Sequence, residues 1–529
     1  MPMSRRTIAA YCPQPGEIMT PTPLHPSSPR RKKPADQAPT PDGKHDAPGQ
    51  NLHGHRRLQV EDVTVVERGP MRQAIAGTIV GNLMEWYDVG VYGYLAVLIG
   101  RVFLPEAAPS VKSLFSLGVF AVTFVARPLG GIILGQLGDR LGRHRVLALT
   151  LTMMSASTFL IGILPDYSVI GAWAPILLIV LKLAQGFSTG GEYAGATTFI
   201  TEYAPDRHRG FYASLLDLGS YLGFANGAAV VSSLQLTMSG AAMEGYVWRV
   251  PFLIALPLAL IAIYFRLKIE DSPAYLQAQA GVANRNQNPT KGIAGLVRSY
   301  WREILTAFVL VAAANTLGYA VTSYMPTYLT TTLGYDTVHG NLLTLPVLVL
   351  MSLGIPVAGA LSDRIGRRPV LFGGSVGAIF LAIPAFLLMM HGQLWLTLLG
   401  LFLLAVPVAL YVSNLASALP ALFPTSSRYG GMGMSYNLAA ALFSGTAPFI
   451  MEALVTVTGD RLAPAYWIMG TSMAGFIAVR VMGESAGKPM PGAMPTVLTH
   501  EEAHHLVETQ DENPDLDIEK VLRDAGELD

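Results

Sequence analysis

Two carboxylates inside one long apolar segment have the clearest potential for chemistry in this chain. Glu85 and Asp88 lie within residues 74–99, and their three-residue spacing places both side chains on one face of a helix. Charge is costly inside a membrane, and a carboxyl group in a dry cavity can hold a proton near neutral pH. We therefore predict that at least one of the two binds and releases a proton. The alternative is a structural pair that anchors a neighbouring helix.

Other charged and polar side chains within apolar segments predict a larger buried site. Arg127 keeps its charge, so it needs a carboxylate partner or an anionic substrate. Lys182 and Glu192 are separated by about 80° around a helix, and Gln185 falls within the same arc. We predict proton coupling by Glu85, Asp88, Glu192 and Asp217, and substrate binding or charge balance by Arg127, Lys182, Gln185, Tyr92 and Tyr193. The alternatives are a buried salt-bridge network that only supports packing, and aromatic rings that serve only as packing or interface anchors.

The composition is that of a membrane protein. Hydrophobic residues make up 51% of the 529 residues and charged residues 14%, whereas soluble proteins carry about 25% charged residues. Long apolar runs predict transmembrane helices, and their continuity excludes a closed β-barrel. We predict twelve spans, centred on 74–99, 113–137, 146–164, 174–200, 211–236, 249–267, 303–328, 340–361, 370–390, 393–417, 431–456 and 464–482.

The spans divide into two six-helix halves of an all-α integral membrane protein. Basic residues concentrate in the loops after the second, fourth, sixth and eighth spans, so the positive-inside rule places both termini in the cytoplasm. The predicted segments are an N-terminal tail (1–70), a first half (71–267), a linker (268–302), a second half (303–482) and an acidic tail (483–529). Residues 1–55, rich in Pro, Arg and Lys, are expected to be disordered, or to precede the true translation start.

Two internal repeats support the division into halves. The loop from Gly135 to Arg145 is repeated from Gly359 to Arg368, 224 residues later, and each copy lies between two apolar runs. A second repeat follows the fourth and tenth spans, where a proline precedes an arginine by four residues in both copies. Two repeats in the same register indicate duplicated halves with a pathway between them.

The first repeated loop favours a gate. Orientation requires its arginines but not its aspartates, so we predict that Asp139 and Asp363 bind basic groups or helix N-termini of the other half. The alternative is a tight turn with basic residues. The predicted gating residues are Gly135, Asp139, Arg140, Gly142 and Arg143 in the first copy, and Gly359, Asp363, Arg364, Gly366 and Arg367 in the second.

The chain resembles the major facilitator superfamily in this arrangement and in its loop motif. Four segments are similar to the metabolite–proton symporter family: Gly81 to Asp88, Arg127 to Gly131, Gln185 to Tyr193 and Trp248 to Pro251. Within it, Lys182 to Gln185, Leu216 to Ser220 and Leu419 to Pro424 are most similar to the proline/glycine-betaine proton symporters. The resemblance covers roughly residues 56–490 and implies a twelve-helix secondary transporter.

Other classes of function lack their signatures. The chain has no G-x-x-x-x-G-K-[ST] motif for an ATP-driven pump, and we find no nucleophile or metal constellation for an enzyme. A formal net charge of zero argues against nucleic acid as a partner. We therefore expect no enzyme activity, no metal and no cofactor other than the proton as coupling ion.

Together these features predict a transporter that imports a small zwitterion, such as proline or glycine betaine, by proton symport with alternating access. A zwitterion needs one cation for its carboxylate, and acids or aromatic faces for its ammonium group. The alternative is a proton symporter of a dicarboxylate or tricarboxylate such as 2-oxoglutarate or citrate; a sensor or scaffold on the same fold is a more distant one. We expect a monomer among lipids of a bacterial inner membrane.

Overall fold

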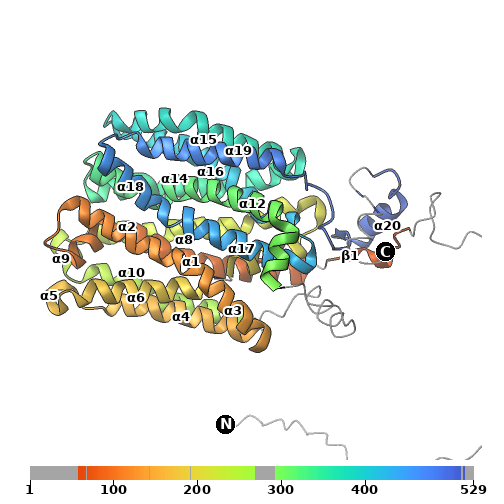
Figure 1. Cartoon of the computed structure of the whole chain (residues 1–529), viewed down its shortest axis with the longest axis horizontal. Coiled ribbons are helices and arrows are strands. Elements are labelled where there is room, and N and C mark those ends of the chain that lie inside the picture. Colours follow the sequence, from red (N-terminus) through yellow and green to blue (C-terminus); the bar gives the residue numbers. More distant parts are fainter. Residues whose placement is uncertain are drawn as a thin grey trace, which may run out of the picture.

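Long helices that run side by side form the body of the molecule (Figure 1). The computed structural model describes residues 57–66, 68–141, 143–190, 192–267, 292–513, 516 and 518. The helices of the first half are α1 (Arg68–Phe103), α2 (Pro109–Val125), α3 (Arg127–Leu141), α4 (Arg143–Ile163), α5 (Tyr167–Ile170), α6 (Trp173–Ser188), α7 (Glu192–Tyr203), η2 (Asp206–His208), α8 (Arg209–Thr237), α9 (Gly240–Gly245), η3 (Val247–Arg249) and α10 (Val250–Leu267).

The second half begins with one long, irregular helix. Its helices are α12 (Gly292–Tyr319), η4 (Ala320–Tyr324), α13 (Met325–Thr327), η5 (Tyr328–Thr332), α14 (Thr337–Ile365), α15 (Arg367–Met390), α16 (Leu394–Ala418), η6 (Pro420–Leu422), α17 (Thr425–Phe443), α18 (Thr446–Thr458) and α19 (Ala463–Val481). Segments η4 and η5 are π-helical, and α13 lies between them. Such turns are rare and frequently mark functional sites.

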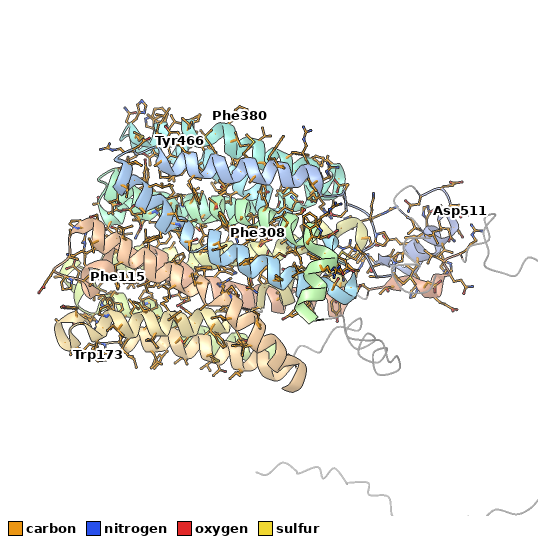
Figure 2. The ribbon with its side chains drawn as sticks, in the orientation of Figure 1. Phe115, Trp173, Phe308, Phe380, Tyr466 and Asp511 are labelled. Atoms are coloured by element: carbon orange, nitrogen blue, oxygen red, sulfur yellow. The ribbon has the colours of Figure 1, made fainter. Side chains whose placement is uncertain are left out.

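The outer surface of the bundle is apolar, as a membrane protein requires. Within the described ranges, seven helical segments are long and apolar enough to cross a membrane, among them Pro109–Leu134 and Leu394–Ala418. Large hydrophobic side chains face outward: Phe380 is 72% exposed and Trp173 66%, at opposite edges of the bundle in Figure 2. The predicted membrane protein is confirmed, whereas the number of twelve spans and the side on which the termini lie stay predictions.

Several predicted spans contain breaks. The second span is divided at Ala126 into α2 and α3, next to Pro128, whose missing N–H removes one helical hydrogen bond. The fourth span is divided after Ser188 into α6 and α7. The angle of about 80° predicted between Lys182 and Glu192 assumes one continuous helix, whereas the two residues lie on α6 and α7 of one candidate span, Trp173–Tyr203.

Small residues bring α8 directly against α1. A Cβ atom added at Gly223 would lie 2.4 Å from the carbonyl oxygen of Leu83, and one added at Gly219 would lie 2.8 Å from that of Ile79. Asn82 donates hydrogen bonds from the same helix to the carbonyl oxygen of Leu216 and to Ser220. This close packing keeps the charged residues of α1 facing the interior of the first half.

Both tails join a small substructure at one end of the bundle, here called the tail end (Figure 1). It contains η1 (Val60–Asp62), β1 (Thr64–Val65), β2 (Thr496–Val497) and α20 (His500–Glu508). Strands β1 and β2 pair in parallel, with Thr64 opposite Thr496. Val63, Val497 and Ala503 form a small hydrophobic cluster beneath them. The predicted N-terminal and acidic C-terminal tails did not include this pairing.

Candidate functional site

An ion pair between α1 and α3 lies deep in the first half. Nη2 of Arg127 is 3.4 Å from Oε1 of Glu85, and both side chains are at most 2% exposed. The guanidinium carbon lies 4.4 Å from the ring centre of Phe124 and 5.6 Å from that of Trp86. The helix break at Ala126 places Arg127 at the first position of α3, from which its side chain reaches α1. Aromatic faces attract a cation, so this pair sits in a pocket of ring surfaces.

A second ion pair joins α1 to α6. Nζ of Lys182 lies 3.5 Å from Oδ2 of Asp88 and 4.2 Å from the ring centre of Tyr92. Gln185 accepts a hydrogen bond from Lys182 (2.8 Å) and donates to Asp88 and to Thr158. All five side chains are buried. The structure therefore assigns each cation of the predicted set to a different carboxylate of α1.

Asp217 on α8 has a different environment. Its Oδ1 accepts a hydrogen bond from the hydroxyl group of Tyr193 (3.2 Å), while its Oδ2 accepts none from the residues that the structure describes. No described cation forms an ion pair with it, although only 4% of the residue is exposed. The ring of Tyr193 stacks on Tyr436 of α17 with centres 4.1 Å apart, which connects this carboxylate to the second half.

Glu192 is buried at the first residue of α7, next to Tyr193. A carboxylate at this position is favoured by the dipole of the helix. The structure thus brings the predicted residues of α1, α3, α6, α7 and α8 into one buried region. Its aromatic wall is completed by Tyr319 at the end of α12, whose ring centre lies 5.3 Å from that of Phe124. Sequence reasoning missed Tyr319 and Tyr436, because an aromatic residue in a span gives no signal of which way it faces.

At the tail end, the second repeated loop contacts the other half. Asp363 accepts hydrogen bonds from the backbone N–H groups of Gly210 and Phe211, both 2.8 Å long. It also forms an ion pair with Arg367 (2.7 Å). Gly210 and Phe211 belong to the first turn of α8, whose N–H groups have no partner within the helix. The predicted contact of Asp363 with a helix N-terminus of the other half is therefore present.

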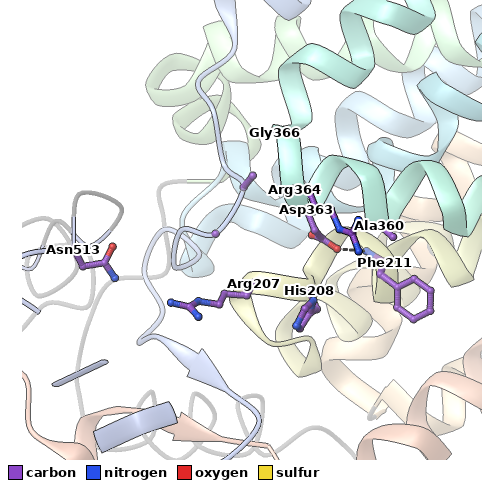
Figure 3. Close-up of a pocket in the computed structure, with 10 residues that line it drawn as sticks. Arg207, His208, Phe211, Ala360, Asp363, Arg364, Gly366 and Asn513 are labelled. Carbon is purple, nitrogen blue, oxygen red and sulfur yellow. Dashed lines mark hydrogen bonds between the residues drawn. The ribbon is translucent and has the colours of Figure 1, made fainter. Parts of the chain in front are cut away.

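Neighbouring residues close the same junction. Gly359 faces Ser214 of α8 so closely that an added Cβ atom would lie 2.4 Å from its hydroxyl oxygen. A pocket of about 530 Å³ lies beside Asp363 and Arg364, with Arg207 and His208 on its other side (Figure 3). Gly366 has a φ of 103°, a conformation that favours glycine, and it ends α14.

The first repeated loop cannot be compared in the same detail. Gly142 lies outside the described residues, and so do the side chains of Asp139, Arg140 and Arg143 and the surroundings of Gly135. The predicted contacts of Asp139 therefore stay a prediction.

The two halves also meet at the opposite end of the bundle. The hydroxyl groups of Tyr94 on α1 and Thr344 on α14 are 2.5 Å apart. Asn341 donates to the side chain of Gln235 (2.8 Å) and to the backbone oxygen of Tyr94. The buried ion pairs consequently lie between two zones of contact, one at each end.

Known proteins with similar sequences are bacterial transporters. The ectoine/proline transporter of Corynebacterium glutamicum is 48% identical over 475 residues, covering 87% of this chain and 94% of that protein. The proline/betaine transporter of Escherichia coli is 41% identical, covering 89% and 95%. The glycine betaine/proline/ectoine/pipecolic acid transporter of Dickeya dadantii is 40% identical over the same shares.

Solved structures with the same fold are symporters of the major facilitator superfamily. A proton:xylose symporter bound to 6-bromo-6-deoxy-D-glucose superimposes with a TM-score of 0.64 at 17% identity, covering 79% of this chain and 97% of that one. A partially occluded inward-open xylose transporter of Escherichia coli gives a TM-score of 0.61. At this identity the likeness shows the fold alone.

These comparisons confirm the predicted class. The chain is a membrane transporter and not an enzyme, and the bacterial relatives agree with an inner-membrane location. Residues 74–490 match the model of the family described as sugar (and other) transporter. The protein therefore belongs to the sugar (and other) transporter family of the major facilitator superfamily.

Proposed function

We propose that this protein imports a small zwitterionic solute, such as proline or glycine betaine, together with a proton. The relatives named above are called transporters of proline, betaine, ectoine and pipecolic acid, all compact molecules with a carboxylate and a cationic nitrogen. A monomer without a cofactor, driven by the proton as coupling ion, is part of the same proposal.

The observation that carries the proposal is the buried Arg127–Glu85 pair among aromatic rings. A guanidinium can bind a substrate carboxylate through two parallel hydrogen bonds. The rings of Trp86, Phe124 and Tyr319 lie around this pair. Aromatic faces attract an ammonium group, including a fully methylated one. Glu85 would then exchange its contact with Arg127 for one with the solute's cationic nitrogen.

The balance of charge in the site favours a zwitterion over a tricarboxylate. Arg127 and Lys182 each have a carboxylate partner on α1, so the described part of the site holds no surplus of cations. A substrate with no net charge leaves this balance unchanged on binding. A tricarboxylate would bring three negative charges into this buried region, and burying each one without a counter-ion costs roughly several kcal/mol.

The best candidates for proton coupling are carboxyl groups that have no cationic partner among the described residues. Asp217 is buried with a hydroxyl donor on one oxygen, and a bound proton would remove its uncompensated charge. Asp88 contacts Lys182, so a proton could bind there only when that pair separates. Proton and solute must both bind better to one conformation than to the other, because a ligand with equal affinity for both shifts nothing.

Alternating access would use the two zones of contact between the halves. Opening the tail end requires Asp363 to leave the first turn of α8, whereas opening the other end requires Tyr94 and Thr344 to separate. Rocking of one half against the other would break one zone while the second stays closed.

Uptake by the purified full-length chain in liposomes tests this proposal. Labelled proline, glycine betaine, 2-oxoglutarate and citrate are compared under an imposed proton gradient, with and without an uncoupler. We expect proline or glycine betaine to accumulate and the uncoupler to abolish accumulation. Accumulation of 2-oxoglutarate or citrate alone would replace the zwitterion with an organic acid, and uphill uptake that resists the uncoupler would remove the proton from the proposal.

A further inference from the structure

A buried carboxylate of the second half takes no part in the site described above. Glu452 lies on α18 within the candidate membrane span Ser427–Thr458, and the residue is 4% exposed. An ionisable residue at membrane depth is costly to retain, so it requires either a partner or a function. Glu452 is not among the site residues predicted from the sequence.

Two hydroxyl groups face the carboxylate, one from each π-helical segment. The hydroxyl group of Tyr324 in η4 lies 3.3 Å from Oε2 of Glu452, and that of Thr331 in η5 lies 3.4 Å from Oε1. Both distances are long for hydrogen bonds between oxygens, whose usual separation is about 2.7–2.8 Å. The contacts are therefore weak as long as Glu452 is a carboxylate.

No cation compensates the charge within the described residues. The elements packed against α18 are α2, α12, η4, α17 and α19. Their charged side chains and those of the following loop form no ion pair with Glu452; the residues concerned are Lys112, Arg298, Arg302, Glu303, Arg428, Asp460, Arg461 and Arg480. The titratable side chain that faces it among the described residues is the phenol of Tyr324, whose ring centre lies 5.8 Å from that of Tyr328; the hydroxyl group of Tyr328 instead donates to the backbone oxygen of Arg461.

The hydrogen bonds of Thr331 leave room for a proton on Glu452. A hydroxyl group has one proton to donate, and that of Thr331 lies closer to the carbonyl oxygen of Thr327 (2.8 Å) than to Glu452. Its lone pairs are then free to accept. A proton on Oε1 of Glu452 would donate to Thr331 while Tyr324 donates to Oε2, so that the protonated form satisfies both contacts.

The position of this cluster links it to the contact between the halves. Segments η4 and α13 pack against α1 of the first half, where a Cβ atom added at Gly93 would lie 3.4 Å from the hydroxyl oxygen of Ser323. Glu452 bonds to both π-helical segments that flank α13, so a change in its contacts acts on both. π-helical turns are rare and occur frequently at functional sites.

We propose that Glu452 is a second proton-binding site of this transporter, and that its protonated form holds the two π-helical segments against α18. One proton from the solution binds to the carboxylate, and no other covalent bond forms or breaks. Loss of the proton leaves a buried charge with two weak donors and loosens the segments that contact α1. The role in transport rests on the proton symport proposed above, whereas the binding of the proton does not.

Infrared difference spectra of the full-length protein in lipid nanodiscs test proton binding directly. The Asp217→Asn variant serves as background, so that a protonated carboxyl band is not due to Asp217. We expect a band at neutral pH that is lost in Glu452→Gln and kept in Glu244→Gln, a matched change at a carboxylate that is 48% exposed and paired with Arg101. An identical band in Asp217→Asn with and without Glu452→Gln would overturn the proposal.

Two further variants separate proton binding from a purely structural role. Glu452→Gln has the shape of the protonated form, so we expect solute exchange to continue, while the dependence of KM on external pH, up to about tenfold per unit for each linked proton, becomes weaker. Tyr324→Phe removes a donor to the carboxylate and should move the midpoint of the infrared titration upward without abolishing transport.

The outcomes distinguish this proposal from the function on which it builds. An unchanged pH dependence of KM in Glu452→Gln, with normal coupling in the unmodified protein, would overturn a role of Glu452 in transport. Uptake that ignores the proton gradient in the unmodified protein would instead overturn proton symport and leave the infrared assignment standing.

Discussion

The carboxylate of Glu202 lies 3.1 Å from Nη1 of Arg428, and this ion pair joins the two copies of the second sequence repeat, Glu202 to Gly210 and Leu422 to Gly430. Arg428 is 1% exposed and also donates to the backbone oxygen of Pro491 (2.7 Å). Three parts of the chain therefore meet at one guanidinium: the end of α7, the start of α17 and the segment after α19. The pair therefore adds to the contacts of Asp363 between the two halves at the tail end.

Removing this pair should open the tail end more often. We expect Glu202→Gln to increase labelling of a Ser214→Cys reporter about threefold or more, because loss of one partner of a buried pair leaves the other charge uncompensated. Cys12 is the one cysteine of the chain, so Cys12→Ser gives a clean background. Labelling is measured with a membrane-impermeant maleimide in inside-out vesicles.

The exposed carboxylate Glu106, at the other end of the bundle, provides the matched control. Glu106→Gln should leave labelling unchanged. Equal labelling of the Glu202→Gln and control proteins would mean that the ion pair does not hold the tail end closed.

The Lys182–Asp88 pair predicts a pattern of loss and rescue in stability. Asp88→Asn leaves a buried lysine without a counter-ion, which should lower the free energy of unfolding by about 3–5 kcal/mol. The double variant Asp88→Asn/Lys182→Met should recover most of this loss. Thermal unfolding in detergent measures both, and equal midpoints for the single and double variants would argue against the pairing.

Asp217→Asn should separate coupling from folding. Asp217 has no cationic partner among the described residues, so the isosteric amide should change the unfolding midpoint little. If Asp217 binds the coupling proton, uphill accumulation is lost while exchange of labelled for unlabelled solute continues. Liposomes from one preparation give both readings, and preserved uphill accumulation would transfer the role to Asp88 or Glu192.

Two glycine substitutions should act in opposite directions. Gly223→Ala places a methyl group 2.4 Å from the carbonyl oxygen of Leu83, so α1 and α8 must move apart at a cost of about 1–3 kcal/mol. Gly433→Ala on α17 meets no atom within 4 Å and should stabilise by about 0.5–1 kcal/mol through helix propensity. The yield of folded protein and its unfolding midpoint report both signs, and similar effects would reject close packing as the cause.

Asp206 predicts a pH dependence at the tail end, outside the spans. Burial raises its pKa from 3.8 to about 6, although Arg209 and the backbone N–H group of Thr496 act in the opposite direction. The protonated form is thus the one favoured in the folded protein. Its contribution to stability is complete below about pH 4 and is lost as the pH rises through about 6.

The measurement is the difference in unfolding midpoint between the unmodified protein and Asp206→Asn. This difference should shift in favour of the unmodified protein as the pH falls from 7 to 5, because only that protein takes up the proton. A constant difference over this range would show that Asp206 has the same pKa in the folded and unfolded chain.

Local patterns predicted which residues are buried but not how they pair. The cost of charge in an apolar run identified Glu85, Asp88, Arg127 and Lys182, and that argument needs only one helix at a time. Which cation meets which carboxylate depends on the rotation of α3 and α6 against α1, for which the sequence of a single helix carries no signal. The same argument, applied consistently, would have found Glu452 within the run 431–456.

The repeated loop motif identified Asp363 because an aspartate recurs beside the arginines in both copies. Duplication of the chain places each copy next to the other half, where a helix N-terminus can bind the carboxylate. The breaks before Arg127 and Glu192 and the π-helical turns were not predicted, since the hydrophobic periodicity continues through them; only the first has a local signal, in Pro128. The pairing of β1 with β2 escaped for a simpler reason: two-residue strands have no periodicity to read.

That small sheet also sets an order of assembly. Thr64 pairs with Thr496, so β1 leaves the ribosome more than four hundred residues before its partner exists. Until synthesis ends, Val63 and its neighbours have no Val497 or Ala503 to cover them. The parallel pairing therefore forms only after β2 has been synthesised. A product truncated before β2 keeps an uncovered strand edge at β1, which distinguishes it from a chain that contains β2.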